Sequence, residues 1–182
     1  WNFNTVRLAF SFPDSPVNSA TGKHSHSVLD YAKLNSVLNI LYSNGIKAIL
    51  DCHNYKDMYG FMGSDAWVND WKSVAQTYKG DNRIAAFEIF NEPYEATWDR
   101  SKVNSIEDVN KALARCIDAI GAVDPERTII YPPPLFIVGP GPYKPIPPEF
   151  KRPNVIIGMH DWTDAKTAED ALKSVQGHKL RT

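Results

Sequence analysis

The sequence has few of the features that mark several specialised classes of protein. It contains only two cysteines, Cys52 and Cys116, in 182 residues, and two are too few for a disulfide framework. We expect both to be buried free thiols, because one falls in an apparent strand and the other in an apparent helix. No apolar run reaches the ~18 residues of a membrane-spanning helix. These absences argue against a disulfide-rich scaffold and against a membrane span.

An excess of charge of one sign is also lacking. The 20 basic and 21 acidic residues leave a net charge of -1, which gives no support to a nucleic-acid or polyanion partner. No glycine-rich phosphate loop follows any apparent strand, which disfavours a nucleotide-binding fold. The first residue is Trp1 rather than methionine, and no signal peptide precedes it. We therefore expect a processed product or a piece of a longer protein.

What the chain does have is a regular alternation of helix-like and strand-like segments. Its length and its 43% hydrophobic content suit one domain with its own core. The long segment 132–153 holds nine of the 13 prolines and is expected to be an irregular loop. Helices are expected at 28–45, 67–78, 105–121 and 167–175, and strands at 5–10, 46–54, 84–90, 127–131 and 154–160.

The segment from Ile84 to Pro93 is the most informative of these. An apolar run ends abruptly in Asn91 and Glu92, and Pro93 then stops it, which is typical of a buried parallel strand that delivers side chains to a site. Asn91 can donate and accept hydrogen bonds, and Glu92 can carry a proton. The pattern suggests acid/base chemistry; a strand that simply runs into a polar loop is the alternative.

Five strands with mainly helical connections predict a parallel α/β sheet. An α/β barrel places its active site at the carboxyl ends of its strands, whereas an open doubly wound sheet mainly uses one crevice. Polar or aromatic clusters at many strand ends therefore favour the barrel. Four of the five strands end in such a cluster, at 7–12, 53–54, 91–92 and 160–162.

Several segments of the chain match one known family. They are NTVRLAF (4–10), ILDCHN (49–54), DWKSVAQTY followed by FEIFNEP (70–78, 87–93), VDPERTIIY (123–131) and VIIGMHDW (155–162). In their order and content the chain resembles glycoside hydrolase family five, a (β/α)8-barrel family of retaining cellulases, mannanases and related β-glycanases. The resemblance implies that residues 1–182 form a single partial (β/α)8 TIM-barrel catalytic domain with strands two to six.

The resemblance assigns chemistry to the pair after the third strand of this chain. Glu92 is implied to be the general acid/base, which protonates the leaving glycosidic oxygen and later activates water. Asn91 is implied to hydrogen-bond the sugar 2-hydroxyl, a contact that strengthens as the oxocarbenium-like transition state forms.

Further polar residues are expected to bind substrate near Glu92. Arg7 lies mid-strand among apolar neighbours and needs a partner. The resemblance implies pairing with the nucleophilic carboxylate, and a structural ion pair elsewhere is the alternative. His53 and His160 are implied to line the subsite where the bond is cut, and Asn54 is also expected to bind substrate. Asp51 lies two residues before His53 on the same strand face, so it either orients the imidazole ring or is a buried structural partner.

Aromatic residues supply the remaining expected contacts with sugar. Trp162 departs from the family, which usually has tyrosine at this position, and an indole N–H can donate but not accept. Trp98 and Tyr59 fall in loops and are candidate stacking platforms. Trp67 and Trp71 are weaker candidates, and the helical period around Trp71 favours a place in the core.

A second carboxylate is needed for either type of glycoside hydrolysis, about 5–5.5 Å from the acid/base for retention and roughly 6.5–9.5 Å for inversion. The resemblance places this glutamate at the end of the seventh strand, which is expected beyond Thr182. Glu88 is four residues before Glu92 on the same strand, roughly 13 Å away at ~3.3 Å per residue. Glu95 and Glu149 fall in loops and remain less favoured alternatives.

By resemblance, then, we expect a secreted retaining endo-β-glycanase, most simply an endo-β-1,4-glucanase, that acts on β-linked oligo- or polysaccharide without a metal or other cofactor. Strands one, seven and eight are expected from residues outside the chain or from a complementary segment. Five strands alone would leave two open sheet edges, so we expect poor solubility or closure by association.

Three alternatives stay open. The first is a β-mannanase or β-1,3-glucanase of the same family. The second is a barrel fragment that binds β-glucan without cutting it. The third is an unrelated α/β hydrolase that uses a metal held by His53, His160 and a carboxylate.

Overall fold

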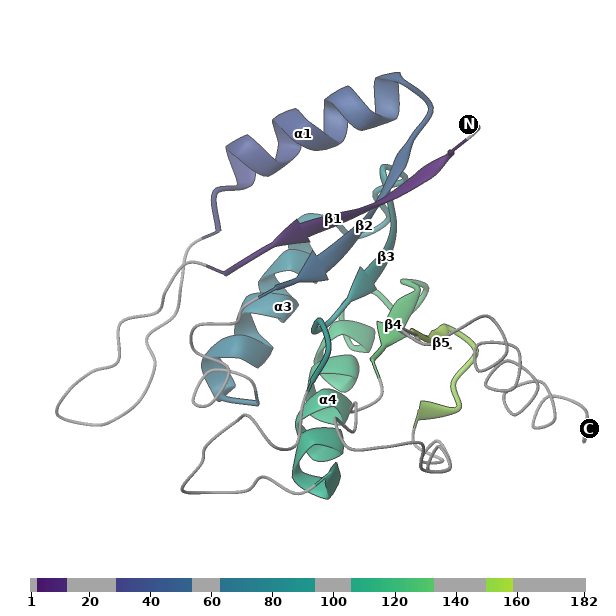
Figure 1. The fold of residues 1–182 in the computed structure, drawn as a ribbon. Coiled ribbons are helices and arrows are strands. Elements are labelled where there is room, and N and C mark those ends of the chain that lie inside the picture. The colour runs from purple at the N-terminus through teal and green to yellow at the C-terminus, as the bar shows by residue number, and fades with distance from the viewer. Residues whose placement is uncertain (1–2, 13–28, 54–62, 94–105, 133–149, 159–182) are drawn as a thin grey trace, which may run out of the picture.

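The fold is built on five parallel strands with helices between them (Figure 1). The computed structural model describes residues 3–12, 29–53, 63–93, 106–132 and 150–158. The sheet order β1-β2-β3-β4-β5 follows the order of the chain, and every neighbouring pair is parallel. The elements are β1 (Thr5–Phe10), α1 (Tyr31–Ser43), β2 (Lys47–Cys52), α3 (Asp65–Thr77), β3 (Ile84–Glu88), α4 (Ile106–Gly121), β4 (Ile129–Tyr131) and β5 (Val155–Ile157).

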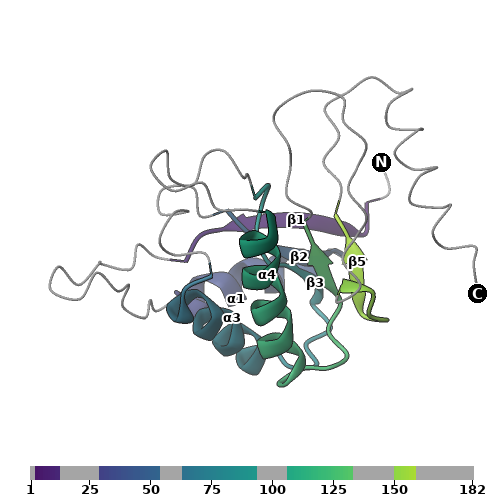
Figure 2. The same cartoon turned by 90° about the horizontal axis from the view of Figure 1, so that it is seen from below.

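Right-handed crossovers in a sheet whose strands follow chain order place all helices on the same face. Figure 2 shows α1, α3 and α4 together on one side of the sheet, as this rule requires. The opposite face is free of helices in the described part of the chain, and it carries the charged side chains considered below. This is the layer arrangement of a (β/α) barrel wall.

The helix boundaries follow from local chemistry. The Asp30 side chain accepts a hydrogen bond from the backbone N–H of Lys33 and begins α1, and Ser64 does the same for Trp67 at the start of α3. Gly45 has a φ of 74°, a conformation that glycine adopts without a steric penalty, so the chain can turn from α1 into β2 there.

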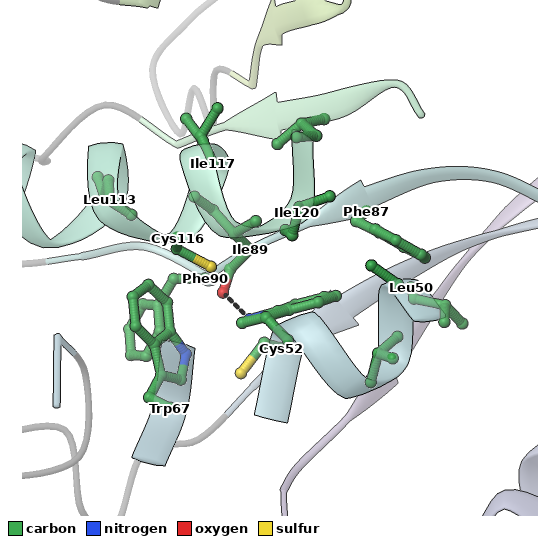
Figure 3. Packing of buried hydrophobic residues seen from close by; sticks show 14 of the residues in the cluster. Leu50, Cys52, Trp67, Phe87, Ile89, Phe90, Leu113, Cys116, Ile117 and Ile120 are labelled. Carbon is green, nitrogen blue, oxygen red and sulfur yellow. Dashed lines mark hydrogen bonds between the residues drawn. The ribbon is translucent and has the colours of Figure 1, made fainter. Parts of the chain in front are cut away.

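The hydrophobic core lies between the helices and the sheet (Figure 3). Trp67 and Trp71 from α3 are completely buried, and the Trp71 indole N–H donates to the Ile89 carbonyl at 3.0 Å. Phe87 of β3 lies 5.4 Å from the Trp71 ring. The buried residues of α4 recur at helical spacing, as in an amphipathic helix. They are Val109, Leu113, Cys116, Ile117 and Ile120.

A buried arginine binds several groups at the amino-terminal end of the sheet. Arg127 is 7% exposed and donates to the carbonyl oxygens of Ile84 and Tyr78, each at 2.7 Å. Its Nε donates to the Asp124 carboxylate at 3.0 Å, and its guanidinium lies 5.0 Å from the centre of the Phe87 ring. One side chain thus ties together the segments that enter β3 and β4.

The outer strands of the described sheet are β1 and β5. Val6 on β1 is 38% exposed and Ile156 on β5 is 49% exposed. Among the described residues neither strand has a partner on its outer side. The two open edges expected from the sequence are therefore present in the described part of the chain.

Most expected elements are present; β1 has its expected bounds, and the other four strands are shorter than expected. β4 and β5 have three residues each, because only that part of each expected run makes ladder contacts. Cys52 and Cys116 are buried free thiols, as predicted. The expected helix 167–175, residues 133–149 of the expected loop 132–153, and residue 105 of the expected helix 105–121 lie outside the described residues. No helix in the described part of the chain is long and apolar enough to cross a membrane.

Candidate active site

Arg7 is at the centre of a charged cluster on the helix-free face. Its side chain reaches from β1 across β2 to Glu88 on β3, where Nε lies 2.6 Å from Oε2 and Nη2 lies 2.7 Å from Oε1. Arg7 and Glu88 thus form a bidentate, charge-assisted pair. Glu88 is only 3% exposed, so the pair is partly shielded from water. The structural ion pair, one of the two alternatives for Arg7, is thus present; pairing with a nucleophilic carboxylate stays a prediction.

The same guanidinium also fixes Asn91. Arg7 Nη2 donates to Asn91 Oδ1 at 2.6 Å, and the backbone N–H of Asn91 donates to the Cys52 carbonyl at 2.9 Å. Because Oδ1 faces Arg7, the donor –NH2 group of this amide points to the other side. The residue is 3% exposed, so both its backbone and its side chain are held in place beyond the end of β3.

Glu92 has an unusual backbone conformation. Its φ of 45° makes it the only non-glycine residue with a positive φ in the described part of the chain. The left-handed region costs a residue with a Cβ roughly 1–2 kcal/mol, and such strain is concentrated at functional sites. Its neighbours on both sides, Asn91 and Pro93, are buried. The strand-end position of Glu92 follows from the sequence, but this conformation does not.

Asp51 and His53 form the third part of the cluster. Asp51 is completely buried, and its Oδ2 lies 2.6 Å from His53 Nδ1 and 3.0 Å from Arg7 Nη2. These are ion-pair distances, but neither Asp51 oxygen accepts a well-aligned hydrogen bond from the described residues. Asp51 contacts both the His53 ring and Arg7, so its two alternatives, orienting the ring and acting as a buried structural partner, stay open.

The electrostatics of the cluster follow from three carboxylates around one guanidinium. Burial raises the pKa of Asp51 to about 7; the negative charge of Glu88, and less strongly that of Glu92, acts in the same direction, while Arg7 opposes it. Burial lowers the pKa of His53, and the positive charge of Arg7 lowers it further. The site therefore holds a carboxyl that titrates near neutral pH next to an imidazole that resists protonation.

The described residues contain four of the predicted site residues, and the structure brings them together. These are Arg7, His53, Asn91 and Glu92, at the carboxyl ends of β2 and β3 or on the strand beside them. The other five lie outside the described residues, and their predicted contacts stay predictions: Asn54, Tyr59, Trp98, His160 and Trp162.

The structure also corrects and extends the sequence reading. Trp67 is fully buried in the core, which rules it out as an exposed sugar platform, and Trp71 is buried as expected. Glu88 was considered only as a possible nucleophile and not as the partner of Arg7. Its signal was a lone acidic residue inside an otherwise apolar strand. Among the described residues no group of three or more His, Cys, Asp or Glu side chains is arranged to hold a metal.

The parallel sheet, its one-sided helices and the charged cluster at its carboxyl end define an incomplete (β/α)8 barrel of the TIM type, with five strands in the described residues. The family model described as cellulase (glycosyl hydrolase family 5) matches residues 1–181, and the chain belongs to that family.

Individual relatives agree with this assignment. An endoglucanase of Paenibacillus polymyxa is 26% identical over 148 residues, which cover 70% of this chain and 36% of that protein. The structure of endoglucanase Cel5A from Thermotoga maritima matches 87% of this chain and 49% of its own, with a TM-score of 0.63 at 20% identity. The structure of endoglucanase Cel5A from Pseudomonas stutzeri matches 70% of this chain and 38% of its own, with a TM-score of 0.53 at 25% identity. The chain thus spans half or less of the length of these relatives.

Proposed function

We propose that the chain supplies the acid/base half of the active site of a retaining endo-β-glycanase, with an endo-β-1,4-glucanase as the first choice. The observation that carries the proposal is the contact of Asn91, a few residues beyond the end of β3, with Arg7 of the cluster that also holds Asp51 and Glu88. Glu92 is the next residue in the chain. Family membership supports hydrolysis of a glycosidic bond. The relatives described as endoglucanases support a β-glucan substrate.

In this mechanism Glu92 acts twice. Its carboxylic acid first protonates the glycosidic oxygen that leaves, and its carboxylate then removes a proton from the attacking water. The –NH2 of Asn91 is the proposed donor to the sugar 2-hydroxyl. That hydrogen bond strengthens as positive charge develops on the sugar ring.

A second carboxylate completes the reaction, about 5–5.5 Å from Glu92 if the configuration is retained. Glu88 does not fit this role, because it is buried and both of its oxygens are engaged by Arg7. We place the nucleophile outside the described residues. The remaining barrel strands are proposed to pair with the open edges of β1 and β5, so that residues 1–182 are one part of a single catalytic domain. The family resemblance further supports secretion.

The proposal is tested by following the products of the whole protein on carboxymethylcellulose, mannan and a β-1,3-glucan. Proton NMR of the first sugar released from a cellulose oligosaccharide shows whether its anomeric configuration is β, as retention requires. If the protein cuts mannan or the β-1,3-glucan faster, the proposed substrate is wrong but the proposed mechanism still stands. Binding of glucan with no turnover on any of the three polymers would instead favour a non-catalytic binding protein.

A further inference from the structure

Asp51 occupies the middle of the charged cluster. Strands β1, β2 and β3 lie side by side (Figure 1), and their register places Asp51 next to Ala9 on one side and Glu88 on the other. One oxygen of Asp51, Oδ2, contacts both Arg7 Nη2 at 3.0 Å and His53 Nδ1 at 2.6 Å. A single buried atom therefore lies between the guanidinium and the ring.

The count of charges shows that this carboxyl is poorly compensated. Asp51 and Glu88 are neighbours on adjacent strands, and among the described residues Arg7 is the cation that contacts both. Arg7 gives its two shortest carboxylate contacts to Glu88, which leaves Asp51 with one longer contact of poor alignment. An ionised Asp51 would be a buried charge with incomplete compensation, and such groups keep a proton instead.

The short contact with His53 requires a proton between the two atoms. Asp51 Oδ2 and His53 Nδ1 would repel each other at 2.6 Å if both lacked a proton, so either Nδ1 carries the proton of the neutral ring or Oδ2 is protonated. The His53 side chain is 25% exposed, so the far edge of its ring can reach solvent or a ligand. Asp51 holds the inner edge.

We propose that Asp51 is a positioning residue: it shares one proton with His53 at neutral pH and so holds the uncharged ring in a fixed orientation at the carboxyl end of β2. The consequence for catalysis rests on the proposed glycanase function, but the shared proton does not. The pKa of Asp51 is raised and the pKa of His53 is lowered. As pH falls, the pair therefore gains its first proton before His53 becomes an imidazolium.

Three other charged groups affect the pKa of Asp51. Glu88 on β3 and Glu92 beyond it both disfavour the ionised form of Asp51, whereas Arg7 on β1 favours it. Asp51→Asn removes the charge of Asp51 and keeps the shape of its side chain. We expect this substitution to change the titration of His53 without changing the fold.

Nitrogen-15 NMR of histidine-labelled protein tests the shared proton directly. His53→Gln assigns the His53 signals, and a pH titration then compares wild type with Asp51→Asn. In wild type we expect two inflections in these signals, one near pH 7 from Asp51 and a second at lower pH from the imidazolium. In Asp51→Asn the inflection near pH 7 should disappear. Asp70→Asn is the matched control, since Asp70 is a 2% exposed carboxyl on α3.

A wild-type His53 that titrates in one step near pH 6.5, or an unchanged two-step curve in Asp51→Asn, would overturn the proposal. The positioning role has its own measurement in the whole protein. Asp51→Asn should lower kcat by roughly 10- to 100-fold with a smaller change in KM, and it should remove the dependence of kcat on pH near 7. Full kcat with an unchanged pH profile would contradict that role. Lack of turnover in wild type would count against the glycanase proposal alone, because the NMR titration needs no turnover.

Discussion

Arg7 and Glu88 are joined across an intervening strand by two parallel contacts, Nε to Oε2 at 2.6 Å and Nη2 to Oε1 at 2.7 Å. Because Arg7 also donates to Asn91, one guanidinium connects Glu88 to the residue next to the proposed acid/base. The pair links the end of β3 to β1, and it makes the site geometry depend on the stability of the sheet.

Glu88→Gln tests this linkage. The neutral amide loses one of two charge-assisted contacts and leaves Arg7 without its main counter-charge, so we expect a loss of about 1.5–3 kcal/mol of unfolding free energy. Urea denaturation measures it. Glu107→Gln is the control, because Glu107 pairs with Lys111 on an exposed part of α4 and should change stability by less than about 1 kcal/mol. Equal effects of the two substitutions would contradict the importance of the buried pair.

The backbone of Glu92 gives a second prediction. At a φ of 45°, glycine fits without the steric cost that a Cβ brings. Glu92→Gly should therefore be more stable than Glu92→Ala by about 1 kcal/mol, although both lack the carboxylate. At an ordinary helical or extended position the alanine variant would be the more stable one, and that order in urea denaturation would refute the strained conformation.

The pH dependence of stability follows from Asp51. Its pKa is raised to about 7 in the folded protein, above the ~3.9 of an unfolded chain, so its protonated form favours folding. The contribution is complete below about pH 4 and is lost as pH rises to about 7. Asp51→Asn should remove this fall, which is on the order of a few kcal/mol. Urea midpoints at pH 5 and pH 8 measure it, and parallel changes in both proteins would contradict it.

Arg127 supplies a prediction away from the site. Arg127→Lys keeps the charge but cannot reproduce the bonds to Asp124 and to the carbonyls of Tyr78 and Ile84. We expect a loss of about 3 kcal/mol, as for breaking a buried pair. Arg115→Lys serves as the control, because Arg115 is 51% exposed and pairs with Asp65 at the surface. A loss below about 1 kcal/mol for Arg127→Lys would show that backbone contacts elsewhere hold this end of the sheet.

Local patterns were sufficient to predict the order of strands and helices. The apolar run into Asn91 and Glu92 predicted a buried strand, and β3 begins at the expected residue, Ile84. The partner of Arg7 was missed because Glu88 lies 81 residues away in sequence, and only the sheet register brings the two together. The φ of Glu92 could not be predicted either, since it depends on how the chain leaves β3 beyond a buried Asn91.

If Glu92 carries the proton that the leaving group needs, its loss should matter most for leaving groups that depend on protonation. Glu92→Gln and wild type are compared on carboxymethylcellulose and on an aryl β-cellobioside whose phenol leaves without protonation. Glu126→Gln, an exposed glutamate at the opposite end of the sheet, is the control. We predict a loss of roughly 10²–10⁴-fold in rate on the polysaccharide for Glu92→Gln, a much smaller loss in the first release of phenol, and no loss for Glu126→Gln. Equal losses on both substrates, or near-wild-type rates on the polysaccharide, would contradict the acid/base role.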